Sequence, residues 1–249
     1  MYTQPATALS PALVIYLIDA SDTMNEVCGT ATKIALVNLA LRVSVRDMVR
    51  RSMRDGVPQP RYKVAIYAYS TTVVDILGGV RDLPDLLKMG LPELVGGGVT
   101  DTAAGFEAVY ALLIQYLRYL APQCPAPLVC HLTDGVFTQA DPTPAVRRIQ
   151  ALQVADGPVL VENVYVADGM LRRPVADWHQ WGGITKPADL ADEYARFLLR
   201  ISSPLPETYR QNINDYGYQL QPGSAFFFPG FHSDLVRLAF TIASSTMLK

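Results

Sequence analysis

Five oxygen-bearing side chains are the residues of this chain best suited to bind a metal ion. They lie in three short stretches, DASDT, GGGVTDT and HLTDG. Carboxylate and hydroxyl oxygens are the ligands that hard divalent cations prefer, so the set favours Mg²⁺, or Mn²⁺ or Ca²⁺, over Zn²⁺. The five residues are Asp19, Ser21, Thr23, Thr100 and Asp134.

Predicted strands explain how these residues could meet. Leu13 to Ile18 is a continuous apolar run, which is typical of a buried parallel strand, and Asp19 follows it directly. Residues 128–132 predict a second such strand just before Asp134. Ligands bind at the carboxyl ends of the strands in open α/β sheets, so we expect one shared site there.

The rest of the chain alternates between strand and helix patterns. Helices are expected at 30–53, 83–89, 101–120, 141–154 and 189–201, and strands also at 62–69, 71–77, 159–166 and 182–185. The gap between 62–69 and 71–77 allows only a hairpin, which makes the second strand antiparallel. We therefore predict an α/β fold, doubly wound, with a mainly parallel central sheet, one antiparallel edge strand and helices on both faces.

One composition shift, at Ser203–Pro206, divides the chain into a domain at 1–203 and a C-terminal extension at 204–249. The extension is aromatic and rich in Gly and Pro, and it ends in a helix expected to begin at Ser233. Two interpretations stay open: it packs on the domain, or it docks another protein.

Composition and charge exclude several classes of protein. Lys and Arg number 21 against 23 Asp and Glu, so bulk charge favours binding to neither nucleic acid nor an anionic membrane. The N-terminal stretch has no basic region, and its apolar run is too short for a signal sequence or a membrane span. The three cysteines form no CxxC pair, which is typical of structural thiols in a reducing cytoplasm.

In their order and spacing, the three motifs resemble the metal-ion-dependent adhesion site (MIDAS) of the von Willebrand factor A (VWA) domain. The resemblance covers about residues 12–202. It implies that Ser21 and Thr23 bind the metal directly, and that Thr100 binds it directly or through water. It implies that the two aspartates act through water or directly, and that a partner protein fills the remaining position with an acidic side chain.

Two residues depart from the VWA pattern. The third position of the first motif is usually serine and here is Thr23, which keeps the oxygen and adds a methyl group. The usual small residue before it is here Asp22, whose negative charge could tighten the cation or repel an acidic partner. Both departures bear on the choice of partner more than on metal binding.

The resemblance implies a cytoplasmic, bacterial stand-alone VWA protein that is a metal-dependent interaction module and not an enzyme. Similar proteins act as scaffolds or adaptors beside a kinase–phosphatase pair or a MoxR-type AAA ATPase. The alternative is a divalent-metal hydrolase in which Asp134 is a general base. A haloacid-dehalogenase phosphatase is disfavoured, because it needs a carboxylic acid as general acid where Ser21 stands, and a hydroxyl cannot replace it. His131, inside a predicted strand, is expected to be a core residue.

Overall fold

A seven-stranded sheet forms the centre of the protein in a computed structural model that describes all residues except 121–122, 136–138, 232–237 and 240–249. Five strands are parallel, in the order β13, β12, β9, β1, β6, and β7 and β8 run antiparallel to β6. This confirms the predicted fold class. The strands are β1 (Ala12–Asp19), β6 (Tyr62–Tyr69), β7 (Val73–Asp75), β8 (Arg81–Asp82), β9 (Leu128–Thr133), β12 (Leu160–Tyr165) and β13 (Phe227–Pro229).

The apolar run that begins at Leu13 forms the central strand, β1. Every residue of β1 is buried, because it pairs with β6 on one side and β9 on the other and helices cover both faces. Asp19 is the last residue of β1, so its carboxylate lies at the carboxyl end of the sheet and is buried with the strand.

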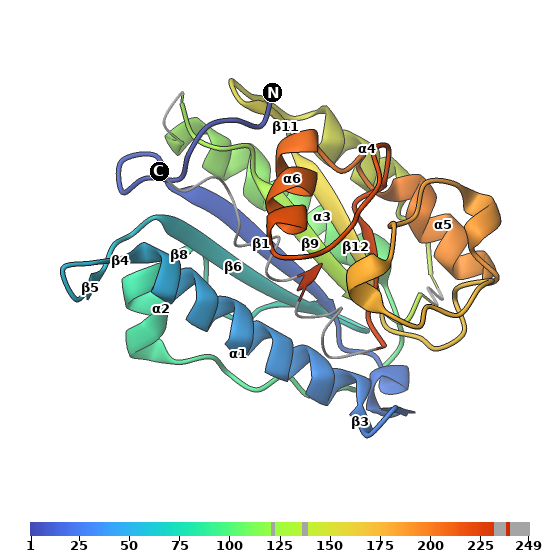
Figure 1. The fold of residues 1–249 in the computed structure, drawn as a ribbon. Helices are drawn as coiled ribbons and strands as arrows, with labels where there is room; N and C mark the ends of the chain where they lie inside the picture. Colours follow the sequence, from blue (N-terminus) through green and yellow to red (C-terminus); the bar gives the residue numbers. More distant parts are fainter. Residues whose placement is uncertain (121–122, 136–138, 232–237, 240–249) are drawn as a thin grey trace.

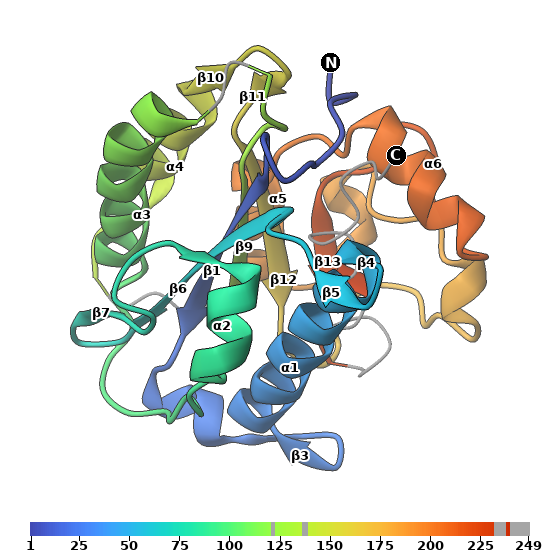
Figure 2. The same ribbon diagram turned by 90° about the vertical axis from the view of Figure 1, so that its left-hand side faces the viewer.

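Two helical layers enclose the sheet (Figures 1 and 2). One face carries α1 (Lys33–Ser52), α2 (Leu83–Met89) and α6 (Glu207–Asp215). The other carries α3 (Thr102–Tyr116), α4 (Thr143–Ala151) and α5 (Glu193–Ile201). Side chains that alternate along the strands settle the two faces, since Tyr16 contacts Ser44 of α1 while His131 packs on Phe106 of α3.

Short elements connect these layers. Among the described residues, three hairpins lie outside the main sheet: β2 (Val27–Cys28) with β3 (Ala31–Thr32), β4 (Met53–Arg54) with β5 (Val57–Pro58), and β10 (Gln153–Val154) with β11 (Gly157–Pro158). The 3₁₀ turns are η1 (Asp22–Asn25), η2 (Leu117–Tyr119), η3 (Trp178–Gln180) and η4 (Pro187–Asp189).

Several predicted boundaries are wrong by a few residues. The first helix begins at Lys33 rather than residue 30, because Thr32 caps it by accepting a hydrogen bond from the Ala35 amide. The fourth ends at Ala151 rather than residue 154, because the next residues turn into the β10–β11 hairpin. The fifth begins at Glu193 rather than residue 189, because Asp192 caps it.

The strand predicted at 182–185 is also wrong, since these residues form no strand. The last strand of the sheet is β13, which comes from the segment after residue 203 and pairs with β12. Phe226, Phe227 and Phe228 are fully buried there. A docking role for this segment stays a prediction.

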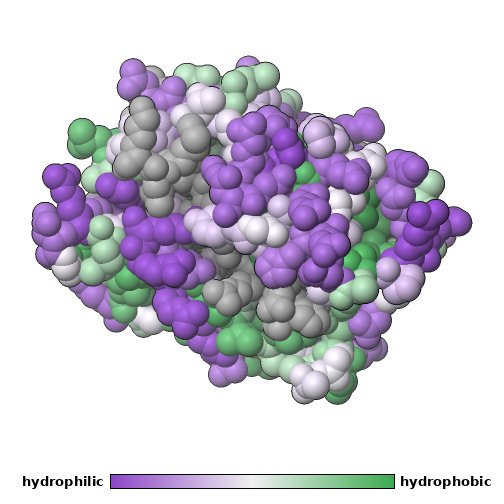
Figure 3. Space-filling model, viewed as in Figure 1, coloured by the Kyte–Doolittle hydropathy of each residue, from purple (hydrophilic) through white to green (hydrophobic). Residues whose placement is uncertain are grey.

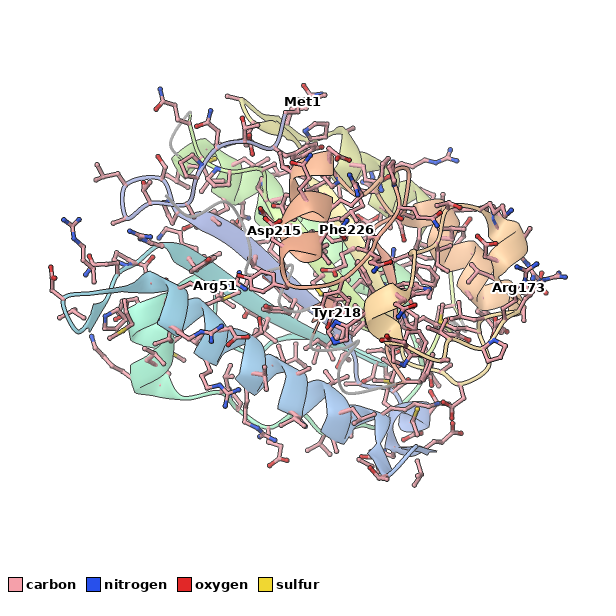
Figure 4. The ribbon with its side chains drawn as sticks, viewed as in Figure 1. Met1, Arg51, Arg173, Asp215, Tyr218 and Phe226 are labelled. Carbon is pink, nitrogen blue, oxygen red and sulfur yellow. The ribbon has the colours of Figure 1, made fainter. Side chains whose placement is uncertain are left out.

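The segment after residue 203 also contacts α1. Arg51, near the end of α1, lies with its guanidinium 5.5 Å from the centroid of the Tyr216 ring, which directly follows α6 and Asp215 (Figure 4). Most of the helix predicted from Ser233 lies outside the described residues, but Leu238 and Ala239 are buried.

The described surface in Figure 3 is mostly hydrophilic, with apolar residues in separate small areas. Among the described helices, none is both long and apolar enough to cross a membrane. The three cysteines are buried and free of disulfides.

Candidate metal centre

Asp19 ties the first and third motifs together at the carboxyl end of the sheet. Its Oδ1 accepts a hydrogen bond from the Ser21 amide at 2.9 Å, and its Oδ2 accepts one from the Thr133 hydroxyl at 2.8 Å. Burial raises the pKa of Asp19 to about 6, and repulsion from Asp134 adds to this, although the hydrogen bonds from Ser21 and Thr133 oppose it. Both carboxylate oxygens of Asp19 thus already accept hydrogen bonds. This suits a position behind the Ser21 and Thr23 hydroxyls, where Asp19 would act on a cation through them or through water.

The two hydroxyls of the first motif lie side by side. Ser21 Oγ and Thr23 Oγ1 are hydrogen-bonded to each other at 3.1 Å. Neighbouring ligands of an octahedral Mg²⁺ with bonds of about 2.0–2.1 Å stand about 2.9 Å apart. The pair is therefore spaced as two ligands of one cation would be. Ser21 is buried, whereas Thr23 is partly exposed and faces the rim.

The glycine-rich loop is fastened to the first motif by two backbone hydrogen bonds. The Asp22 amide donates to the Gly98 carbonyl at 2.9 Å, and the Gly97 amide donates to the Ala20 carbonyl at 2.7 Å. Gly98 has a φ of +86°, and a Cβ there would meet Thr71 Oγ1 at 2.4 Å, so only glycine fits. This close approach brings buried Thr100, two residues further on, to the same end of the sheet.

Asp134 follows β9 and is 5% exposed. Its Oδ2 accepts a hydrogen bond from Lys33 Nζ at 3.1 Å, while its Oδ1 is buried and has no hydrogen-bond partner among the described residues. The next residue, Gly135, has a φ of +93°, and a Cβ there would meet the Tyr165 ring at 2.4 Å. The turn that aims Asp134 at the centre therefore depends on glycine.

Lys33 is the first residue of α1, and its ammonium lies between Asp134 and Glu26, at 2.8 Å from Glu26 Oε2. Burial alone would lower the pKa of Lys33. The hydrogen bond to Glu26 and the charge of Asp134 outweigh this effect and raise the pKa above its usual value. The centre thus contains a protein-borne cation.

Sequence reasoning missed Lys33 and Thr133, and it placed Glu26 on the rim of the first loop without its contact to Lys33. Lys33 falls on a predicted helix among other basic residues, and no local pattern marks it as buried. Thr133 could have been found, because a hydroxyl beside Asp134 at a strand end can reach the neighbouring strand end. Residues 136–139 are expected to line the rim beside Asp134, and the first three of them lie outside the described residues.

The residues present fit a divalent cation. An unpartnered buried carboxylate oxygen on Asp134 and a hydroxyl pair on the neighbouring loop offer oxygen donors of the kind that Mg²⁺, Mn²⁺ and Ca²⁺ accept. The described residues hold no group of three or more His, Cys, Asp and Glu that could bind a metal by themselves. A cation here would therefore depend on the Ser21, Thr23 and Thr100 hydroxyls together with the two aspartates.

A chain of hydrogen bonds runs from this centre into the sheet. The Tyr69 hydroxyl donates to His131 Nε2 at 2.7 Å, and His131 Nδ1 donates to Asn163 Oδ1 at 2.7 Å. Asn163 Nδ2 in turn donates to the Ser202 hydroxyl at 2.9 Å, which fixes the direction of the chain. Burial lowers the pKa of His131 to about 4. His131 is a neutral core residue, as predicted.

Comparisons of sequence find no relative, since no protein-family model and no curated protein matches the chain. Comparisons of structure do find similar folds. The pilus adhesin SpaC from Lactobacillus rhamnosus GG matches over 97% of this chain and 31% of its own length, at 9% identity and a TM-score of 0.55. Proximal thread matrix protein 1 from the mussel byssus matches over 94% of this chain and 48% of its own, at 14% identity and a TM-score of 0.51.

A third match is to a domain whose name is given. The vWF domain of the type V pili tip protein Mfa5 from Porphyromonas gingivalis matches over 52% of this chain and 39% of its own, at 15% identity and a TM-score of 0.40. The chain thus spans between 31% and 48% of the length of these three proteins. At such identities the shared property is the fold.

Proposed function

We propose that this chain is a VWA-type domain that binds another protein through a divalent cation. The observation that carries this proposal is a buried oxygen of Asp134 with no partner among the described residues, at the same end of the sheet as two hydroxyls 3.1 Å apart. Buried polar atoms are normally satisfied, so such an oxygen at the end of the sheet that also carries the hydroxyl pair favours an ion as the missing partner. Mg²⁺ is the first candidate, with Mn²⁺ and Ca²⁺ as alternatives.

The donor set also favours an acidic partner. Ser21, Thr23 and Thr100 are neutral, and both oxygens of Asp19 already accept hydrogen bonds. A cation held mainly by neutral donors keeps much of its charge and attracts a carboxylate from outside. We therefore propose a Glu or Asp side chain of the partner as the remaining ligand.

Binding is better supported than hydrolysis. The free oxygen of Asp134 is the one assigned to the cation, its other oxygen is held by Lys33, and His131 is buried inside the sheet, so none of these groups is left as a general base. Two of the matched proteins are named as a pilus adhesin and a thread matrix protein, which fits a binding role. We propose that the chain is not an enzyme and, because its three thiols are free, that it works in the cytoplasm.

The proposal predicts that millimolar Mg²⁺, Mn²⁺ or Ca²⁺ stabilises the protein against thermal unfolding. A hundredfold excess over the dissociation constant adds about 2.7 kcal/mol, or about 5–10 °C in Tm for a domain of this size. Ser21→Ala and Asp134→Asn should stay folded in EDTA and lose this shift. A Tm that no divalent cation moves would overturn the proposal.

A matched control is Asp156→Asn, because Asp156 is also buried but lies near the amino ends of β9 and β12. There its oxygens accept hydrogen bonds from the Thr3, Gln4 and Ala126 amides. This variant should lose stability and keep the metal response.

In the same proteins, partner capture from the source cell should require Mg²⁺, fail in EDTA and identify the assembly, whether a kinase–phosphatase pair or an AAA ATPase.

A further inference from the structure

Lys33 places a positive charge at the metal centre, where its position is fixed by backbone structure. The residue is 9% exposed and opens α1 directly after its cap, Thr32. The β2–β3 hairpin folds the preceding segment back, so that the Lys33 amide donates to the Glu26 carbonyl at 3.0 Å. The β2–β3 hairpin and the first turn of α1 therefore hold the ammonium near Asp134.

The ammonium and a divalent cation would share one carboxylate. Lys33 Nζ engages Oδ2 of Asp134 at 3.1 Å, whereas Oδ1 of the same group is buried and unpartnered. The lysine thus leaves a coordination position open. It also neutralises part of the charge that would attract the metal, and it repels any cation bound on the other oxygen.

Glu26 acts on the same ammonium from the other side. Its Oε2 lies 2.8 Å from Lys33 Nζ, closer than Asp134 Oδ2, and its side chain is 63% exposed. The negative charge of Glu26 offsets part of the positive charge of Lys33. It therefore lowers the electrostatic repulsion between Lys33 and a cation bound to Asp134. The two carboxylates therefore compete for one lysine.

We propose that Lys33 is a built-in competitor of the divalent cation, which keeps the metal affinity of this centre low, and that Glu26 moderates the competition. This inference rests on the proposed metal-dependent binding. A weakly held metal makes the partner's carboxylate more important for completing the complex, since metal and partner raise each other's affinity by the same factor. Metal capture and partner capture then become one coupled event.

The test is titration of the full chain with Mn²⁺ and with Mg²⁺ by calorimetry. Lys33→Met, which removes the charge and keeps an unbranched side chain one atom shorter, should bind about tenfold more tightly, the effect of a unit charge about 6 Å from a dication in bulk water. Lys33→Arg keeps the charge and should bind like the unchanged protein. Glu26→Gln should bind more weakly, because Lys33 then repels the metal without compensation.

The matched control is Lys63→Met, which removes a lysine from a half-buried pair with Asp82 in β8 and should leave metal affinity unchanged. Equal affinity in folded Lys33→Met and the unchanged protein would overturn this inference and leave the proposed function standing. Absence of binding in every variant would overturn both. Should Lys33→Met fail to fold, equal or tighter binding by Glu26→Gln, a change at an exposed position, would overturn it.

Discussion

The metal centre and the hydrogen-bonded chain inside the sheet are both buried and polar, but they differ in how many of their atoms are used. In the interior chain, Tyr69, His131 and Asn163 each have a partner on both sides, from Thr102 at one end to Ser202 at the other. At the metal centre, Asp134 keeps one buried oxygen without a partner.

This is the difference expected between a structural polar group and one that binds a ligand. A satisfied chain in the interior links the two helical elements that it touches, α3 and the end of α5, and offers nothing to a ligand. An unpartnered oxygen at the carboxyl end of a parallel sheet lies where ligands bind in this class of fold.

An unpartnered oxygen alone is not enough to indicate a ligand. Glu162 of β12 is fully buried, and in the described part of the chain its carboxyl oxygens have no nitrogen or oxygen donor as a hydrogen-bond partner. Its neighbour in the strand register is Cys130, whose thiol is a weak donor. Burial raises the pKa of Glu162 well above its usual value. Glu162 lies in the middle of β12 and not at the carboxyl end of the sheet, where ligands bind in this class of fold, so burial of its neutral form in the core accounts for it.

The largest effect should come from breaking the interior chain with His131→Leu. This change leaves the Tyr69 hydroxyl without the acceptor for its proton and the Asn163 amide oxygen without its donor, at about 1–3 kcal/mol each, so the free energy of unfolding should fall by about 2–6 kcal/mol. Urea denaturation measures this loss. The stabilisation by Mg²⁺ should remain, because no proposed ligand changes.

The matched control for this variant is His179→Leu, since His179 is exposed and stacks on Tyr218 near the surface. It should change the free energy of unfolding by less than about 0.5 kcal/mol. If both histidine variants lost the same stability, the interior chain would not have the structural role assigned to it.

Glu162 gives a smaller effect that depends on pH. Its pKa in the folded protein lies above the ordinary value of 4.5, so the folded state keeps a proton that the unfolded chain releases. Stability is therefore full below about pH 4.5 and falls as the pH rises, by at most about 1.4 kcal/mol per pH unit. Glu162→Gln cannot ionise and should lose this dependence.

Urea denaturation of both proteins between about pH 5 and pH 8 measures this effect. The variant should gain stability relative to the unchanged protein as the pH rises, because only the unchanged protein carries the cost of holding the proton. Taking the difference between the two cancels the contribution of Asp19, whose raised pKa acts in the same direction. Parallel curves would show that Glu162 ionises alike in both states.

Much of the fold was predictable because its signals are local. The buried run of β1 and the aromatic and β-branched stretch at Tyr62–Tyr69 have the composition of strands, and the structure places strands there. The helix at Leu83–Met89 was predicted with the same bounds. β13 was missed because three residues, Phe227–Pro229, carry no period and become a strand only by pairing with β12.

The centre was less predictable, since it depends on contacts between distant parts of the chain. The polar residues at the ends of β1 and β9 could be found from strand patterns, and the structure joins these ends through Asp19 and Thr133. Lys33 and Asp134 are 101 residues apart. The sequence of α1 does not indicate that its first residue, Lys33, contacts the loop that follows β9.

The smallest expected effect is that of Asp22→Asn, which tests the exposed rim of the metal centre against its buried interior. Asp22 is exposed, and its backbone amide, which the change leaves in place, makes the contact with Gly98. The fold should therefore be unaffected.

A charge about 10 Å from a dication alters affinity about fourfold in water at low ionic strength and by less than about twofold at 0.15 M salt. Mn²⁺ should bind Asp22→Asn more weakly by these factors, whereas an acidic partner should bind the metal-loaded variant more tightly, because the same charge attracts the cation and repels the partner. Titrations at the two salt concentrations separate this screened effect from that of buried Lys33, which salt should change much less. A loss of metal affinity that salt leaves unchanged would mean that Asp22 contacts the cation directly.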